Sequence, residues 1–71
     1  MARAEQREDL EDALARLPVG YRTVVVLHDA AGMTSPAIAD ALDLGLPATK
    51  QRLRRGRMML VSALAEDDPK R

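Results

Sequence analysis

Apolar residues recur at spacings of three and four along most of the chain, and this pattern predicts helices rather than strands. The first helix is expected from about Glu5 to Leu17. Pro18 should end it, because a proline disfavours helical geometry in the residue before it. The recurring apolar positions of this helix are Leu10, Ala13, Leu14 and Leu17.

A second helix is expected from Pro18 to Ala31. Proline suits the first turn of a helix, and Gly32 is placed to end it. The four consecutive apolar residues 24–27 are also compatible with a strand. The helical spacing around them and the lack of a partner strand in the sequence favour a helix.

A short third helix and a long fourth helix follow, joined by a turn at residues 43–45. Thr34 is a candidate N-cap of the third helix, and Pro36 falls in its first turn, where the missing N–H does no harm. The fourth helix should run from about Pro47 to Ala65. The buried side of the third helix is expected to be Ile38, Ala39 and Leu42.

The fourth helix divides into an apolar side and a cationic side when its residues are placed 100° apart. The apolar side should anchor the helix, and the cationic side should face outward. The apolar side holds Thr49, Leu53, Gly56, Leu60 and Leu64. The outward side holds Pro47, Lys50, Gln51, Arg54, Arg55 and Met58.

The composition limits the domain count and the class of function. The 71 residues allow one domain, expected over 1–71 with flexible ends at 1–4 and 66–71. Without Phe or Trp the core must be aliphatic and small, so an enzyme, a cofactor or a small-molecule substrate is not expected. Without Cys there is neither a disulfide nor a thiolate metal site. The sequence shows no membrane span or signal core, so a cytoplasmic protein is expected.

Charge is unevenly distributed although the net charge is zero. Residues 1–31 carry four basic and six acidic residues, whereas residues 50–57 carry five basic residues and no acid. A run of one sign steers charged ligands even when the average charge is zero. This run at the start of the longest helix indicates nucleic acid as a partner.

A short helix, a turn and a longer basic helix form the helix-turn-helix pattern. The predicted fold is therefore an all-α, four-helix domain with a C-terminal helix-turn-helix. The long helix would enter the major groove, where Arg and Lys suit guanine and Gln suits adenine. Lys50, Gln51 and Arg54 lie at the centre of the outward side. Arg55, Arg52 and Arg57 lie towards its flanks, where phosphates or acidic partners are nearer.

Ten short pieces of the sequence keep a gapless register from Leu17 to Arg57. These pieces are Leu17-Pro18, Tyr21-Arg22, Val24, Gly32-Met33-Thr34, Ile38-Ala39, Ala41-Leu42, Lys50, Arg52-Leu53, Arg55 and Arg57. Together they resemble region 4 of the extracytoplasmic-function (ECF) sigma factors. The resemblance implies binding to the −35 element of a bacterial promoter, docking on the β flap of RNA polymerase, and an anti-sigma factor. Complete family members also carry a domain for the −10 element, so this chain is expected to be an excised domain.

Candidate DNA-binding residues follow from the pattern and from the resemblance. Thr34 and Ser35 open the short helix, where free N–H groups attract phosphate. Arg22 matches a family position that approaches the DNA backbone. By resemblance, the start of the fourth helix approaches the −35 element. The residues expected there are Pro47, Lys50, Gln51, Arg54 and Arg55.

Several residues depart from the usual family pattern. Gln51 replaces the usual Ser, and its longer amide is expected to shift preference at one base pair towards adenine. Thr49 puts a hydroxyl on the buried side, where it needs a partner. Gly56 replaces the usual Ala, at a cost of about 1 kcal/mol in a helix interior. Ala37 stands where a Glu could have completed a capping box.

Two other functions remain open at this point. One is a LuxR-type response-regulator output domain, which would dimerise through its last helix. The other is a protein-interaction module that binds polymerase or an anti-sigma factor and tolerates loss of Lys50 and Arg54. Val25 and Val26 widen the apolar surface of the second helix and are expected to meet such a partner. His28 is expected to pack at the core boundary, and Met33, Met58 and Met59 are expected to fill gaps.

Overall fold

Helices make up most of the part of the chain that the computed structural model describes, which is the backbone of residues 2–66 and the side chains of residues 9–65. No strand occurs among these residues, so the strand alternative for residues 24–27 is wrong. Of the expected flexible ends, residues 2–4 lie in the first helix, and Met1 and 67–71 lie outside the described residues. The helices are α1 (Ala2–Arg16), α2 (Val19–Val25), η1 (Val26–Ala30), α3 (Ser35–Ala41) and α4 (Leu46–Glu66).

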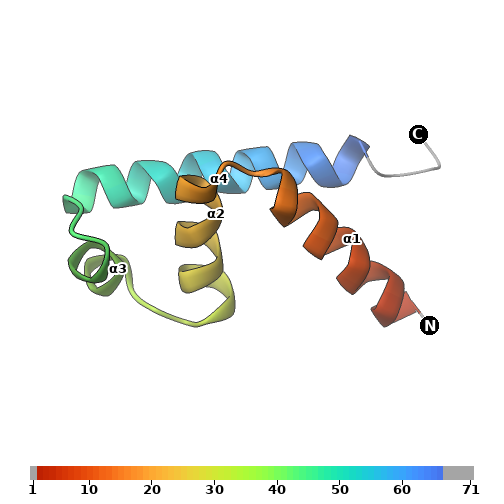
Figure 1. Ribbon diagram of the computed structural model, residues 1–71, viewed down its shortest axis with the longest axis horizontal. Helices are drawn as coiled ribbons and strands as arrows, with labels where there is room; N and C mark the ends of the chain where they lie inside the picture. The colour runs from red at the N-terminus through yellow and green to blue at the C-terminus, as the bar shows by residue number, and fades with distance from the viewer. Residues whose placement is uncertain (1, 67–71) are drawn as a thin grey trace.

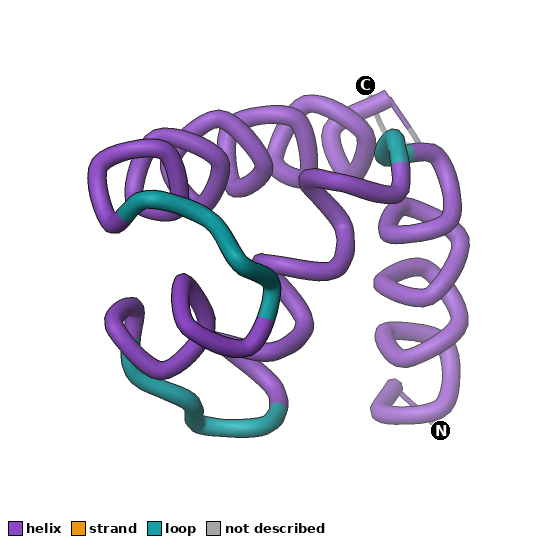
Figure 2. Tube along the Cα trace, turned by 60° about the vertical axis from the view of Figure 1, so that its left-hand side comes forward, coloured by secondary structure: helices purple, strands orange, loops and turns teal. Residues whose placement is uncertain are grey.

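The long helix α4 is the element against which α1, α2 and α3 pack (Figure 1). Helix α2 crosses the middle of α4, whereas α3 lies near its N-terminal end and α1 descends from its C-terminal half. The view in Figure 2 also places α1 and α3 at opposite ends of the molecule. This arrangement confirms an all-α domain in which α3 and α4 form the helix-turn-helix.

The core is aliphatic, as the composition requires. Met33 and Met59 are half-buried against it and fill gaps as expected. Met58 does not, because 64% of it is exposed on the outward side of α4. The buried residues that form the central cluster are Leu17, Val24, Val25, Ile38 and Leu53.

The ends of the helices follow local chemistry. The Oγ1 of Thr34 accepts a hydrogen bond from the Ala37 N–H at 3.2 Å, which confirms the predicted N-cap. Gly32 has a φ of 75°, which glycine adopts at little cost, and it follows the second helical segment as expected. In the turn before α4 the left-handed residue is Asp43, with a φ of 55°. An Asp tolerates this region better than most residues do.

The second helical segment is not α-helical throughout. Its last five residues form the π-helix η1, in which the Ala31 N–H donates to the carbonyl of Val26, five residues back, at 3.0 Å. The wider turn carries one more residue per hydrogen bond than an α-helix. The α-helix predicted to Ala31 is therefore wrong beyond Val25. The spacing of apolar residues could not show this, because it does not distinguish a π-helix from an α-helix.

Gly56 lies where α2 packs closely on α4. A Cβ added there would stand 2.6 Å from Cγ2 of Val25 and 3.2 Å from the carbonyl oxygen of Tyr21. The cost of glycine expected from the sequence took account of helix propensity alone. In the structure the missing Cβ also makes room for the close contact with α2. Thr49, one of its neighbours on the buried side, donates its hydroxyl to the carbonyl of Gly45 at 3.0 Å, which supplies the partner that its burial requires.

Candidate nucleic-acid interface

The turn between α3 and α4 is held by backbone hydrogen bonds. The Leu44 N–H donates to the carbonyl of Ala39 at 2.8 Å, and the Thr49 N–H donates to that of Gly45 at 3.0 Å. Ile38 is fully buried beneath this turn. These contacts fix the direction in which α4 begins. They therefore also fix the direction in which the exposed side chains of its first turns point.

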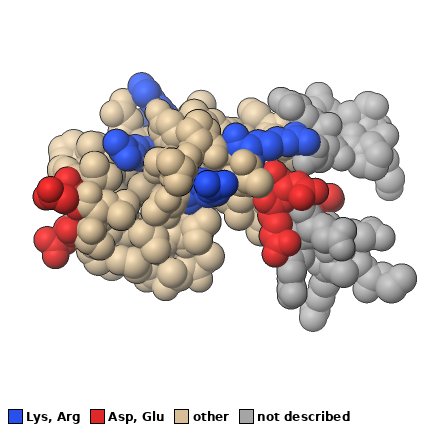
Figure 3. Space-filling view, in the orientation of Figure 1, with Lys and Arg blue, Asp and Glu red and all other residues tan. Residues whose placement is uncertain are grey.

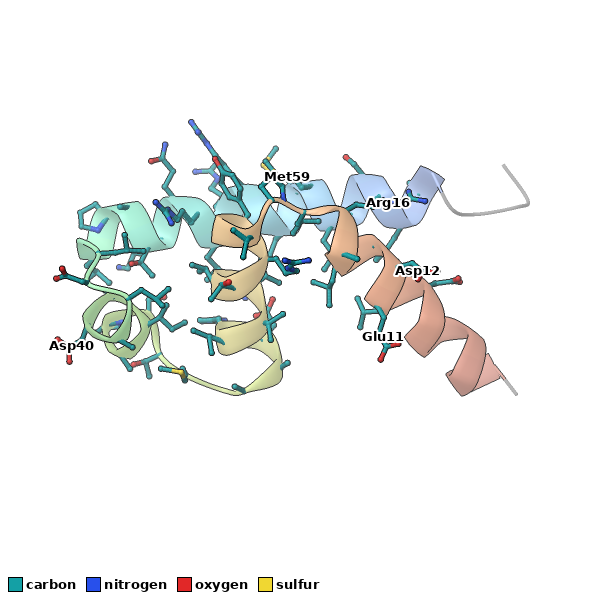
Figure 4. The ribbon with its side chains drawn as sticks, viewed as in Figure 1. Glu11, Asp12, Arg16, Asp40 and Met59 are labelled. Atoms are coloured by element: carbon teal, nitrogen blue, oxygen red, sulfur yellow. The ribbon has the colours of Figure 1, made fainter. Side chains whose placement is uncertain are left out.

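The first half of α4 presents one exposed polar face. Thr49, Leu53 and Gly56 are buried on the opposite side, as the periodicity predicted. Figure 3 shows acidic side chains in two groups, one at the left end of the face in view and one right of centre, and Figure 4 places Asp40 on α3 and Glu11 and Asp12 on α1. The outward face of α4, defined by its exposed residues, is formed by Pro47, Lys50, Gln51, Arg54 and Arg55.

The other candidate residues lie on neighbouring elements. Thr34 is exposed and Ser35 is half-buried at the start of α3, and Arg22 is half-buried on α2. The Oγ1 of Thr34 already accepts the Ala37 N–H, but a hydroxyl can donate its own proton at the same time. Thr34 can therefore cap α3 and still donate to an anion.

Arg52 does not belong to the outward face. It is half-buried, and its Nη1 lies 3.2 Å from the place where a Cβ on Gly20 would stand. With Val19, Thr23 and Leu42 it lines a hollow between α2 and the turn before α4. The sequence placed Arg52 at a flank of the outward side, whereas the structure turns its guanidinium towards α2.

The family described as "Sigma-70, region 4" matches residues 7–60, well over half of the chain. The chain belongs to the sigma-70 region 4 family. No solved structure matches it closely enough to add to this assignment. Region 4 is a DNA-binding domain of sigma factors that takes part in promoter recognition and contacts RNA polymerase, and it is not a catalytic family. The match favours the sigma interpretation over the LuxR-type output domain.

In this region 4 domain the last arginine of the basic run is paired within the chain. The Nε of Arg57 donates to Oδ2 of Asp29 at 3.0 Å, and its Nη2 donates to Oδ1. The Nδ1 of His28 lies 2.8 Å from Oδ1 of Asp29 and 3.2 Å from Nη2 of Arg57. A ring nitrogen can donate to the carboxylate or accept from the guanidinium, depending on its proton. The cluster joins η1 to α4 at the surface, and His28 lies at the core boundary as expected.

Sequence reasoning missed the Asp29–Arg57 pair. Its members are 28 residues apart on different helices, and no periodicity connects them. The signal in the sequence was an acid at position 29, next to His28, in a mostly apolar segment. Among the residues that the structure describes, no group of three or more potential ligands could hold a metal ion, and no helix is long and apolar enough to cross a membrane.

The Asp29–Arg57 pair should make stability depend on pH in the acid range. The hydrogen bond from Arg57, followed by that from His28, lowers the pKa of Asp29 from 3.8 to about 2. Because this folded-state pKa lies below the unfolded one, the pair stabilises the fold above about pH 4 and loses its effect as the pH falls towards 2. Both side chains are partly exposed to water, which screens the pair, so the effect should stay within about 1 kcal/mol.

Thermal unfolding of the parent and of Asp29→Asn at several pH values between 5 and 2 measures this effect. The parent should have the higher Tm at pH 5, and the gap should close towards pH 2. A gap that stays constant over this range would show that the ionised carboxylate of Asp29 does not stabilise the fold.

An apolar cavity of about 130 Å³ opens between α1, η1 and α4. Val26 is half-buried on its wall. Val25 is only 2% exposed and faces Gly56, so it belongs to the core and does not extend the free surface as the sequence suggested. The cavity is lined by Leu10, Leu14, Val25, Val26, Asp29, Ala30 and Leu60.

Proposed function

We propose that this chain is region 4 of an ECF sigma factor and that it recognises the −35 element of bacterial promoters in the cytoplasm. The observation that carries the proposal is the outward face of α4, where Lys50, Gln51 and Arg54 are exposed while Thr49 and Leu53 are buried against the core. The major groove admits one α-helix, and its base edges accept hydrogen bonds from long polar side chains. A rigidly seated helix with such side chains in its first turns suits base reading.

The roles of the residues follow from their position on this face. Lys50 and Arg54 are one turn apart and suit guanine, whereas Gln51 suits adenine because its amide both donates and accepts. Pro47 opens the face and offers an apolar contact, such as one with a thymine methyl group. Arg55 lies towards the flank of this face. With DNA bound, its guanidinium would reach either a base or a phosphate.

Contacts with the DNA backbone would orient the domain. We assign these contacts to Arg22 on α2 and to Thr34 and Ser35 at the start of α3. Thr34 retains a hydroxyl proton that a phosphate oxygen can accept, and Arg22 contributes a positive charge. Such contacts fix the register on the duplex and carry no sequence information themselves.

The cavity between α1, η1 and α4 supports a protein partner. Its apolar wall and its volume of about 130 Å³ suit an apolar side chain from another protein. We assign this site to the β flap of RNA polymerase, or to an anti-sigma factor that competes with it. The site uses Leu60 in the second half of α4, whereas the DNA-facing residues lie in its first half, so DNA and protein could bind together.

Replacement of Gln51 by Ser should change which sequence is preferred, because the shorter hydroxyl cannot form the same two bonds to adenine. The expected loss is about 1–3 kcal/mol for the favoured base at one position. Selection of bound sequences from a pool of randomised duplexes, with the parent and Gln51→Ser, measures the preference.

Arg22→Ala is the matched control for this selection. It should weaken binding to all sequences about equally and reduce the salt dependence by about one phosphate. Identical sequence logos for the parent and Gln51→Ser would show that Gln51 reads no base. A chain that selects no sequence at all, yet binds polymerase, would instead support the protein-interaction module.

A further inference from the structure

Three basic residues form a line along α4. Lys50, Arg54 and Arg57 are spaced by four and three residues, which keeps them on one stripe of the helix. The next position on this stripe is Val61, which is apolar and 66% exposed. The line of positive charge therefore ends at Arg57.

Arg57 lies where a phosphate would be within reach. Arg57 comes seven positions after Lys50, which is about 10 Å along the helix axis. The major groove is about 12 Å wide. With Lys50 and Arg54 at base edges, Arg57 falls near the edge of the groove, which phosphates line.

The guanidinium of Arg57 is already paired with the carboxylate of Asp29. Two hydrogen bonds join the groups, and Nε and Nη2 of Arg57 both point at the carboxylate. The side chains of Arg57 and Asp29 are 48% and 40% exposed, so water and a phosphate could reach the pair. Asp29 lies in η1, the continuation of α2, so the acid comes from a different helical segment than α4. Its carboxylate pairs with the last basic residue of the line.

We propose that Asp29 withholds Arg57 from DNA phosphates and thereby limits the sequence-independent part of DNA affinity. This inference rests on the proposed function, in which the outward face of α4 enters the groove. A free Arg57 would release counterions from one more phosphate and strengthen binding to every sequence. Paired with Asp29, it contributes no net charge at the groove edge.

Two substitutions break the same ion pair with opposite consequences for charge. Asp29→Asn frees the Arg57 cation, whereas Arg57→Gln removes it. Asp29→Ala is a second variant for the same purpose. The Asn amide oxygen could still accept a hydrogen bond from Arg57, whereas Ala has no such acceptor. The double variant Asp29→Asn/Arg57→Gln has the net charge of the parent and controls for the loss of an acid.

The measurement is the dissociation constant of the 71-residue chain for a random-sequence duplex and a promoter duplex, as a function of salt. Asp29→Asn should steepen the slope of log K against log salt by about 0.9. Its affinity advantage over the parent should fall about three- to fourfold between 50 and 200 mM salt. The double variant should keep the slope of the parent, and Arg57→Gln should not steepen it. The two single variants should change Tm by similar amounts.

Lys50→Gln distinguishes failure of the inference from failure of the proposed function, because it should make the slope shallower by about 0.9. An unchanged slope for both Asp29 variants would overturn the inference, even if Lys50→Gln behaves as expected. A shallower slope for the double variant would also overturn it, because Arg57 would then contact phosphate in the parent. If the parent does not bind DNA, or if Lys50→Gln has no effect, both the proposed function and the inference fail.

Discussion

Gly56→Ala is expected to lower the free energy of unfolding by about 1–3 kcal/mol, the usual cost of an added methyl group in a tight contact. Alanine is the better helix former by about 1 kcal/mol, so helix propensity alone gives the opposite sign. The added Cβ would stand 2.6 Å from Cγ2 of Val25 and 3.2 Å from the carbonyl of Tyr21. The backbone carbonyl cannot rotate away, so α2 and α4 must separate.

Chemical denaturation of the parent, Gly56→Ala and the double variant Val25→Ala/Gly56→Ala tests this packing. Removal of the Val25 methyl groups relieves the closest contact. The double variant should therefore lose less free energy of unfolding than the sum of the losses in Val25→Ala and Gly56→Ala. Gly20→Ala is the matched control, because the Cβ there would meet only the flexible end of Arg52 at 3.2 Å. Higher stability for Gly56→Ala than for the parent would contradict the close packing of α2 on α4.

The local rules that predicted the helices also predicted the position of the candidate interface. Periodicity separated buried Thr49 and Leu53 from exposed Lys50 and Arg54, because a helix of known pitch fixes which residues share a side. The cap at Thr34 and the glycine at position 32 followed from chemistry within a few residues. These features depend only on neighbours in the sequence, and for that reason they could be predicted.

Features that depend on two distant elements could not be predicted in this way. The need for glycine at position 56 arises from Val25 and Tyr21 on another helix. The pairing of Arg57 with Asp29 and the turn of Arg52 towards Gly20 likewise require knowledge of how α2 crosses α4. Their places in the basic run suggested phosphate contacts for both Arg52 and Arg57, whereas in the structure Arg52 points towards α2 and Arg57 pairs with Asp29.

Loss of both Lys50 and Arg54 is expected to have the largest effect on DNA binding. Each base contact of this kind contributes about 1–3 kcal/mol, and each cation also releases counterions. The double variant Lys50→Ala/Arg54→Ala should therefore bind a promoter duplex at least about 30-fold more weakly. Its stability should change little, because both side chains are exposed and neither fills the core.

Met58→Ala is the matched control for this loss. Met58 is exposed on the same side of α4, one turn beyond Arg54, and it carries no charge. Its replacement should leave both the affinity for DNA and its salt dependence nearly unchanged. An equal loss of binding for Met58→Ala would mean that the whole exposed length of α4, rather than its first half, contacts DNA.

Footprinting on promoter fragments with mapped start sites tests the central claim most directly. The parent chain and the Met58→Ala variant should protect the −35 element, and Lys50→Ala/Arg54→Ala should leave it open at the same protein concentration. Protection of the −35 element by the double variant, or protection by the parent only at other sequences, would contradict recognition of this element by the first half of α4.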